Sequence, residues 1–458
     1  MHTEDTIAAI STPPGRGGIG IVRLSGGNAI KIAERIFISP KSKKLRQTAS
    51  HRILYGHIAN PKNREIIDEA LVSVMKAPNT YTREDMVEIN CHGGPAPLRR
   101  VLEIVLEKGA RLAGPGEFTQ RAFLNGRIDL AQAEAVLDVI NALTEQGRRT
   151  AVEQLRGGLS ARTEAVREKL ADLAAVVETH IDFPEEDIGP APLKDMNKRA
   201  LRIQQALKKL TDSARYGMIL REGLKTAIIG RPNVGKSSLL NALLEHDRAI
   251  VTEIPGTTRD VIEEYLNING IPARIMDTAG IREVRDIAER EGVKRSIRAM
   301  EDADLVLLVL DGSEALHKTD LELAERSASK NTIFVINKTD LPRKINPKSG
   351  NVDLSPIVHI SAKSGTGLEE LKNKITESIT AGNTGSGDAL VTNVRHARAL
   401  EKALASVGSF ISALPKKTSP EFLSVELRDA LDAVGEIAGT TTPDDILNRI
   451  FSNFCIGK

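Results

Sequence analysis

One eight-residue motif constrains the fold more than any other feature of this chain. Residues 230–237 read G-R-P-N-V-G-K-S, after a β-like run at 226–229 and before a helix-like stretch at 238–243. Glycines let such a loop wrap phosphate groups with backbone N–H groups, and the following helix N-terminus adds positive potential. The order of strand, loop and helix therefore predicts a P-loop nucleotide site within an α/β domain.

Further residues of this region have predicted roles around the phosphates. Lys236 is placed to reach the β- and γ-phosphates, and Ser237 to bind Mg²⁺. The motif Asp277-Thr278-Ala279-Gly280 follows a β-like run. At this position the Asp277 carboxylate can hold Mg²⁺ through water, and the Gly280 backbone amide can contact the γ-phosphate. Thr257 and Thr258 lie in the loop between the two motifs, with Thr258 as the second hydroxyl on Mg²⁺. We expect this loop to be a switch that γ-phosphate orders.

Two later motifs predict that the base is guanine. Asn337-Lys338-Thr339-Asp340 ends a β-like run at 332–336, and Ser361-Ala362-Lys363 ends another at 358–360. A carboxylate at Asp340 can accept hydrogen bonds from the ring N–H and the exocyclic amine of guanine, a pair of donors that adenine lacks. The Ala362 amide can meet the guanine carbonyl. Together with the P-loop, these motifs predict GTP rather than ATP.

The spacing of the motifs alone does not show which residue positions the attacking water. Ras-like switches place a Gln directly after Asp-Thr-Ala-Gly, but Ile281 stands there in this chain. The nearby candidates are the acids Glu283, Asp286, Glu289 and Glu291, and the candidates for an arginine finger are Arg259, Arg282 and Arg285. Asn233 and the switch hydroxyls are an alternative to a finger, because they could hold a monovalent cation against the phosphates.

The length of 458 residues favours about three domains. We expect a multidomain α+β and α/β protein with an N-terminal α+β domain, a helical domain built from two separated segments, and an inserted Ras-like P-loop G domain. The predicted boundaries are 1–118 for the N-terminal domain, 119–216 and 381–458 for the helical segments, and 217–380 for the G domain. Strand-like runs near 7–10, 19–22, 71–74 and 87–89 and helical patches near 28–37 and 96–108 make up the N-terminal domain.

Composition excludes several classes of protein. The net charge is only +2, so the chain as a whole is not strongly basic. Contact with RNA would need a local patch of basic residues or a partner. Cys91 and Cys455 are the two cysteines, without the spacing of a zinc site. The longest apolar run, residues 305–310, is too short to cross a bilayer, so we expect no membrane contact and a cytoplasmic location.

Residues 15–20 fit the dinucleotide-binding motif G-x-G-x-x-G. A strand-like run follows them, however, where a dinucleotide-binding fold needs a helix. We therefore expect no flavin or nicotinamide on this chain.

Motifs outside the nucleotide site narrow the family. They are T-P-P-G-R-G-G at 12–18, H-G-G-P at 92–95, G-P-G-E-F-T at 114–119, R-A-F-L-N-G at 121–126 and the terminal F-C-I-G-K at 454–458. Together they resemble the MnmE (TrmE) family, the GTPases of tRNA wobble-uridine modification, over essentially the full length. The resemblance implies a homodimer, a flavoprotein partner (MnmG) in a heterotetramer, and tRNA as the substrate of the complex. The implied reaction adds an aminomethyl or carboxymethylaminomethyl group at carbon 5 of the wobble uridine.

The resemblance also implies roles for individual residues. Glu289 matches the family's water-orienting acid, which acts with potassium stimulation when two G domains dimerise. The matching K⁺ positions are Asn233, Thr252, Ile254 and Thr257. The remaining GTP contacts fall on Val234, Gly235, Ser238, Glu253, Pro255, Gly256, Asp277, Thr278, Ala279, Gly280, Asn337, Lys338, Asp340, Ser361, Ala362 and Lys363. Positions that contact 5-formyltetrahydrofolate or a related methylene folate are Arg23, Glu88, Arg127 and Lys458.

Cys455 matches a terminal cysteine that is important for modification in this family; the alternative is a small residue buried at a chain end. The alternative function for the whole chain is a ribosome-assembly GTPase that binds RNA and uses GTP as a timer. That reading predicts a dedicated RNA module such as a KH domain, and no such motif follows residue 381.

Overall fold

The computed structural model describes residues 5–182, 190–246, 264–276, 297–346, 353–380, 390–416, 418–440 and 442–458. The chain forms two compact units: unit 1 contains residues 1–137 and 435–458, and unit 2 contains residues 138–434. The chain therefore leaves unit 1 once, forms unit 2, and returns to unit 1 with its C-terminal end. Residues 381–387, which read A-G-N-T-G-S-G and whose composition is typical of a linker, lie outside the described residues.

Unit 1 is built on a seven-stranded sheet in the order β3-β4-β5-β6-β2-β1-β7. Neighbouring strands are antiparallel, except that β1 and β7 are parallel. The strands are β1 (Ile7–Ile10), β2 (Gly17–Ser25), β3 (Phe37–Ile38), β4 (Arg52–Ala59), β5 (Ile66–Met75), β6 (Met86–Gly93) and β7 (Arg111–Leu112). All four predicted strand runs are confirmed, and the run after residues 15–20 is part of β2, as expected.

Helices cover one face of this sheet. Alternate residues of the strands, such as Leu54 and Val72, share a core with Ile32 and Val101 from α1 (Ala29–Ile36) and α2 (Pro95–Glu107). A second cluster joins α3 (Glu117–Leu124) and α4 (Leu130–Asn141) to α15 (Asp444–Ser452). The C-terminal end of the chain is therefore a structural part of this unit.

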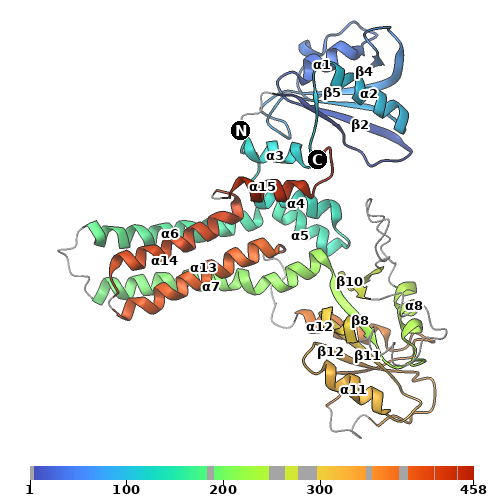
Figure 1. Cartoon of the computed structure of the whole chain (residues 1–458), viewed down its shortest axis with the longest axis vertical. Coiled ribbons are helices and arrows are strands. Elements are labelled where there is room, and N and C mark those ends of the chain that lie inside the picture. Colours follow the sequence, from blue (N-terminus) through green and yellow to red (C-terminus); the bar gives the residue numbers. More distant parts are fainter. Residues whose placement is uncertain are drawn as a thin grey trace. The chain divides into compact units, whose positions relative to one another are not determined.

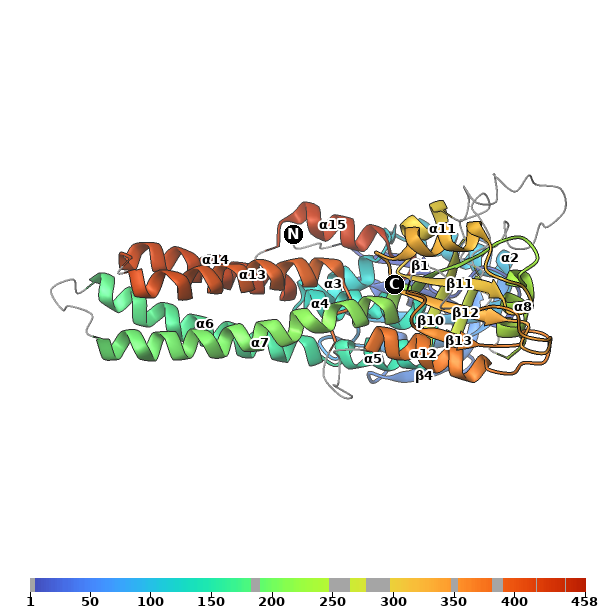
Figure 2. The ribbon, with the colours of Figure 1, turned by 90° about the horizontal axis from the view of Figure 1, so that it is seen from below.

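Unit 2 contains four long helices that run side by side (Figures 1 and 2). They are α6 (Gly158–Asp182), α7 (Pro190–Glu222), α13 (Val394–Ala413) and α14 (Pro420–Ala438), with the shorter α5 (Glu145–Leu155) at one end. α13 packs against α7, although the G-domain residues separate them in sequence. The prediction that the separated helical segments pack together is confirmed.

The second sheet has the order β13-β12-β11-β8-β10-β9, and all its neighbouring strands are parallel except β9 and β10. Its strands are β8 (Leu224–Ile229), β9 (Glu264–Ile268), β10 (Ile271–Met276), β11 (Leu305–Asp311), β12 (Thr332–Asn337) and β13 (Ile357–His359). α8 (Lys236–His246) and α12 (Leu368–Thr380) share one buried cluster with the sheet, and α11 (Lys318–Ser327) shares another. Helices thus cover both faces, as expected for the predicted α/β domain.

The apolar run at 305–310 is the centre of this sheet, where β11 is buried along its whole length. No helix within the described ranges is long and apolar enough to cross a membrane.

Candidate nucleotide site and a second polar site

The P-loop motif lies between β8 and α8, as predicted. Gly230 and Gly235 have φ angles of +145° and +100°, which suit glycine and strain other residues. A Cβ at Gly230 would lie 2.4 Å from the carbonyl oxygen of Val309, and one at Gly235 would lie 2.2 Å from the side-chain nitrogen of Asn337. Both glycines are therefore required by close packing as well as by backbone conformation.

Asn233 lies at the exposed tip of this loop. Its φ angle of +65° is in the left-handed region, which Asn tolerates better than most residues. Because its side chain is exposed, the amide oxygen is accessible to an ion or a nucleotide.

Lys236 begins α8 and reaches back across the loop. Its Nζ donates to the carbonyl oxygens of Gly230 at 2.8 Å and Arg231 at 2.7 Å. Burial lowers the pKa of the ammonium to about 8, because removal from water disfavours the charged form. A phosphate oxygen is a charged acceptor and stabilises an ammonium more strongly than a carbonyl does. The side chain is thus held at the place where phosphate binding would use it.

The guanine motifs meet the P-loop through one buried side chain. Asn337 donates from Nδ2 to the carbonyl oxygen of Val234 at 2.9 Å, and its Oδ1 accepts from the backbone N–H of Ala362 at 3.0 Å. Asn337 is only 2% exposed. The P-loop, the N-K-x-D motif and the S-A-K motif are therefore one hydrogen-bonded assembly at the carboxyl ends of the parallel strands, where α/β sheets bind ligands.

Asp340 is presented to solvent beside this assembly. Its Oδ1 accepts a hydrogen bond of 2.7 Å from Oγ of the buried Ser361. That bond is the main reason why the pKa of the Asp340 carboxyl is lowered. The ionised carboxylate is fixed by one oxygen, and it can accept the two hydrogen bonds that a guanine edge offers.

Two ion pairs of the nucleotide site were not predicted from the sequence. Lys338 Nζ lies 2.5 Å from Oδ2 of the buried Asp311, and Arg231 Nε donates to both carboxylate oxygens of Asp320 at 2.9 and 3.0 Å. These pairs join the two loops to the ends of β11 and α11. Their partners are distant in sequence, so no local motif reveals them.

The switch residues and the proposed water-positioning acid lie outside the described residues. These are Thr252, Glu253, Ile254, Pro255, Gly256, Thr257, Thr258, Asp277, Thr278, Ala279, Gly280 and Glu289, together with the alternatives Glu283, Asp286, Glu291, Arg259, Arg282 and Arg285. Their roles stay predictions.

A second polar site lies in unit 1. Arg23 and Glu88 are paired across β2 and β6, and Arg23 Nε donates to Glu88 Oε1 at 2.9 Å. Arg23 Nη1 also donates to the carbonyl oxygen of Gly457 at 3.2 Å, and Ser11 Oγ donates to the same oxygen at 3.0 Å. Arg23, which also holds Glu88, therefore contacts the C-terminal tail, defined here as residues 453–458.

The tail is held along its length. The backbone N–H of Phe118 donates to the carbonyl oxygen of Lys458 at 3.1 Å. Phe454 is buried against Phe451. Gly457 has a φ of +96°, and a Cβ there would lie 2.4 Å from the carbonyl oxygen of Ile10. The tail therefore has a defined conformation, and its glycine is required where it approaches β1.

The two predicted arginines both lie against aromatic rings. The Arg127 guanidinium is 4.8 Å from the ring centroid of Tyr81, and the Arg23 guanidinium is 5.7 Å from that of Phe118. Tyr81 packs against the buried cluster that contains Phe118. Such contacts orient a guanidinium while its edge stays open to other partners.

The two cysteines differ in accessibility. Cys455 is exposed within the tail, so the alternative of a buried residue at the chain end is wrong. Cys91 is buried, and this burial raises the pKa of its thiol to about 12. Thiols react as thiolates, so burial disfavours reaction at Cys91, and Cys455 is the accessible one of the two.

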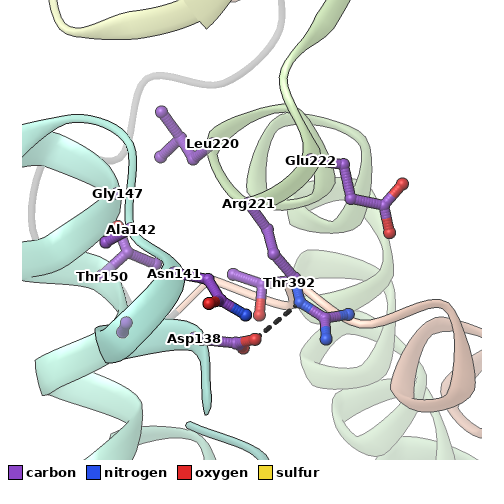
Figure 3. Close-up of a pocket in the computed structure, with 10 residues that line it drawn as sticks. Asp138, Asn141, Ala142, Gly147, Thr150, Leu220, Arg221, Glu222 and Thr392 are labelled. Carbon is purple, nitrogen blue, oxygen red and sulfur yellow. Dashed lines mark hydrogen bonds and ion pairs between the residues drawn. The ribbon is translucent and has the colours of Figure 1, made fainter. Parts of the chain in front are cut away.

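A cavity of about 220 Å³ lies in unit 2, away from the predicted site residues. Figure 3 shows Arg221, Asp138, Asn141 and Thr392 around it. Arg221 Nε donates to Oδ1 of the mostly buried Asp138 at 2.7 Å. Because Arg221 lies at the end of α7, just before β8, this ion pair links α4 to α7 close to the point where the chain enters the nucleotide-binding sheet.

Comparisons with known proteins agree with this arrangement. A family model described as GTP-binding protein TrmE N-terminus matches residues 6–127, and one described as MnmE helical domain matches residues 130–455. The chain is 51% identical to the tRNA modification GTPase MnmE of Alkaliphilus oremlandii, over 100% of both chains. It is 48% identical to that of Clostridioides difficile, again over 100% of both chains. With this identity over the full length, the chain belongs to the MnmE family of tRNA modification GTPases.

Proposed function

We propose that this GTPase acts in the complex that adds an aminomethyl or carboxymethylaminomethyl group at carbon 5 of the wobble uridine of tRNA. The observation that carries the proposal is that Arg23 bonds both Glu88 and the carbonyl oxygen of Gly457. It places a guanidinium and a carboxylate beside a tail that also bears the exposed Cys455. A reduced folate has hydrogen-bond donors and acceptors along one ring edge, so this pair of groups fits it. A folate supplies the one-carbon unit that this modification needs.

The proposed folate contacts are Arg23, Glu88, Arg127 and Lys458, with 5-formyltetrahydrofolate or a methylene folate as the ligand. The contact of Lys458 with Phe118 and of Arg127 with Tyr81 supports this set, because Tyr81 packs against the buried cluster of unit 1 that contains Phe118.

In the nucleotide site, Mg²⁺ would bind Ser237 and Thr258, and K⁺ would bind Asn233, Thr252, Ile254 and Thr257. The exposed Asn233 side chain supports the K⁺ assignment. Glu289 would orient the water when two G domains dimerise. A cation beside the phosphates would then replace the arginine finger that other switch GTPases use.

We also propose that the chain forms a homodimer, and that this homodimer binds the flavoprotein MnmG in a heterotetramer. The proposed location is the cytoplasm, and the proposed domain boundaries are those predicted from the sequence. The outer face of the unit 1 sheet supports dimerisation, because Ile53, Tyr55 and Leu71 lie on this face and are exposed. Contiguous apolar residues of this kind mark interaction surfaces.

The proposal is tested in cells that lack this chain alone. Total tRNA is digested, and its modified nucleosides are measured by mass spectrometry, with and without a plasmid that restores the chain. We expect the carbon-5 aminomethyl uridines to disappear and to return with the plasmid. An unchanged nucleoside profile would contradict the proposal and favour the ribosome-assembly function.

A further inference from the structure

The solvent face of α7 carries a stripe of basic side chains. Buried residues of this helix recur every three or four positions, for example at Met196, Ala200, Ile203 and Leu207, so they form one face. Exposed lysines and arginines lie on the other side: Lys194, Lys198, Arg202, Lys208 and Lys209, here called the basic stripe. The exposed acid Asp212 lies one turn beyond Lys208 and Lys209 on the same helix.

The basic stripe differs from the other charged helix surfaces of unit 2. On α5 and α6, exposed arginines pair with acids one turn away, as in Arg148–Glu145 and Arg167–Glu164. On α7 itself, Arg199 pairs with Asp195 at the border of the stripe. None of the five stripe residues forms an ion pair or a side-chain hydrogen bond with another residue in the ranges that the structure describes. Their charges are therefore available to a partner.

The spacing of the stripe is unfavourable for the free helix. Lys194, Lys198 and Arg202 follow one another at intervals of four residues, and like charges at this spacing repel and destabilise a helix. Neutral or alternating residues would avoid this repulsion. A ligand with closely spaced negative charges would remove it.

We propose that the basic stripe binds the phosphate backbone of the tRNA, an inference that rests on the proposed function. From Lys194 to Lys209 the stripe extends about 22 Å along the helix axis, which is long enough to contact several successive phosphates. Because the net charge of the whole chain is only +2, this local concentration of charge is what RNA binding requires. Lysines on a straight helix supply positioning contacts to phosphate rather than recognition of bases.

The test measures binding of an unmodified tRNA transcript to the full-length chain by fluorescence anisotropy at several salt concentrations. The variant is K194E/K198E/R202E. The control is K41E/K43E/K44E, which makes the same change in net charge on an exposed loop of unit 1. We expect the α7 variant to weaken binding at least tenfold. The slope of log K against log salt should also become shallower by about two to three, because up to three phosphate contacts are lost.

The control variant should keep its affinity within about threefold, and K194R/K198R should bind as the wild type does, since charge is retained. Both triple variants should hydrolyse GTP at the wild-type rate and melt at the same temperature. An unchanged tRNA affinity and salt slope in the α7 variant would overturn the proposal. Unchanged tRNA affinity with weakened binding of MnmG would also overturn it and assign the stripe to an acidic protein surface.

Failure here is distinguishable from failure of the proposed function. If the α7 variant restores the modified nucleosides in cells and binds tRNA normally, only the basic stripe is wrongly assigned. If the cells that lack the chain have a normal nucleoside profile, the proposed function itself fails.

Discussion

The side-chain amide of Asn337 donates a hydrogen bond of 2.9 Å to the carbonyl oxygen of Val234, although 103 residues separate the two. Through Oδ1 the same side chain holds Ala362. One buried side chain therefore links the P-loop to both motifs predicted to recognise the base.

Replacement of Asn337 by alanine should separate these loops. The substitution leaves the carbonyl of Val234 and the N–H of Ala362 without their partner, and we expect a loss of about 2 to 4 kcal/mol in the free energy of unfolding. Urea denaturation measures this loss, and a GTP titration should show at least tenfold weaker binding. Asn373→Ala, which removes an exposed hydrogen bond on α12, should cost less than about 1 kcal/mol. Equal effects of both variants would contradict the account.

Asp340→Asn should change the preferred base. The substitution replaces one acceptor oxygen by a donor, so it opposes the ring N–H and amine of guanine and suits the carbonyl of xanthine. We expect GTP affinity to fall by at least tenfold and xanthosine triphosphate to become the better ligand. Competition with a fluorescent nucleotide measures both affinities. Ser361→Ala serves as a comparison, because it removes the supporting bond to Oδ1 and the bond from the Ser364 backbone N–H but keeps the Asp340 carboxylate. A retained preference for GTP would reject the base assignment.

GTP affinity should fall as the pH rises above about 8. The pKa of Lys236 in the free protein is about 8, whereas a phosphate keeps the ammonium protonated. Binding above pH 8 must therefore take up a proton, which weakens affinity by up to tenfold per pH unit. Titrations between pH 7 and 9 check this, with guanosine as a competitor that has no phosphate. A GTP affinity that stays constant over this range would contradict the role of Lys236.

The same pKa shift affects the stability of the nucleotide-free protein. Below about pH 8, folding buries a charged ammonium, which lowers the stability of the folded state. This destabilisation fades as the pH rises from about 8 toward the ordinary value of a lysine.

Gly457→Ala should displace the C-terminal tail. The added Cβ would lie 2.4 Å from the carbonyl oxygen of Ile10, in a backbone conformation with a φ of +96°. We expect the affinity for 5-formyltetrahydrofolate to fall at least tenfold in a fluorescence titration, while the rate of GTP hydrolysis changes less than twofold. Ile456→Ala is the control, because that side chain is 51% exposed. Normal folate binding by Gly457→Ala would exclude the tail from the site.

Local patterns predict the elements of this chain well. The run at 7–10 is a strand with these bounds, and the motif at 230–237 lies between a strand and a helix, because periodicity and glycine spacing are local properties. β4 and β9 were not predicted, since neither run stands out from its neighbours in the sequence.

Contacts between distant residues are less predictable. The sequence shows Asn337 and Asp340 as parts of one motif. Asn337 reaches the P-loop because β12, β11 and β8 are neighbouring parallel strands, an arrangement that the sequence does not show. Likewise, Arg23 meets Gly457 because the chain returns to unit 1. The basic stripe can be recognised only when it is known which face of α7 is buried.

We expect hydrolysis of GTP by this chain to be needed for the tRNA modification. The most direct test is a reconstitution with purified chain, MnmG, unmodified tRNA, a reduced folate and glycine or ammonium, followed by nucleoside mass spectrometry. Wild-type chain with GTP should give the carbon-5 modified uridine. Glu289→Ala, which should bind GTP normally but hydrolyse it slowly, and wild type with a non-hydrolysable GTP analogue should both give little product. Equal yields in all three reactions would contradict the account.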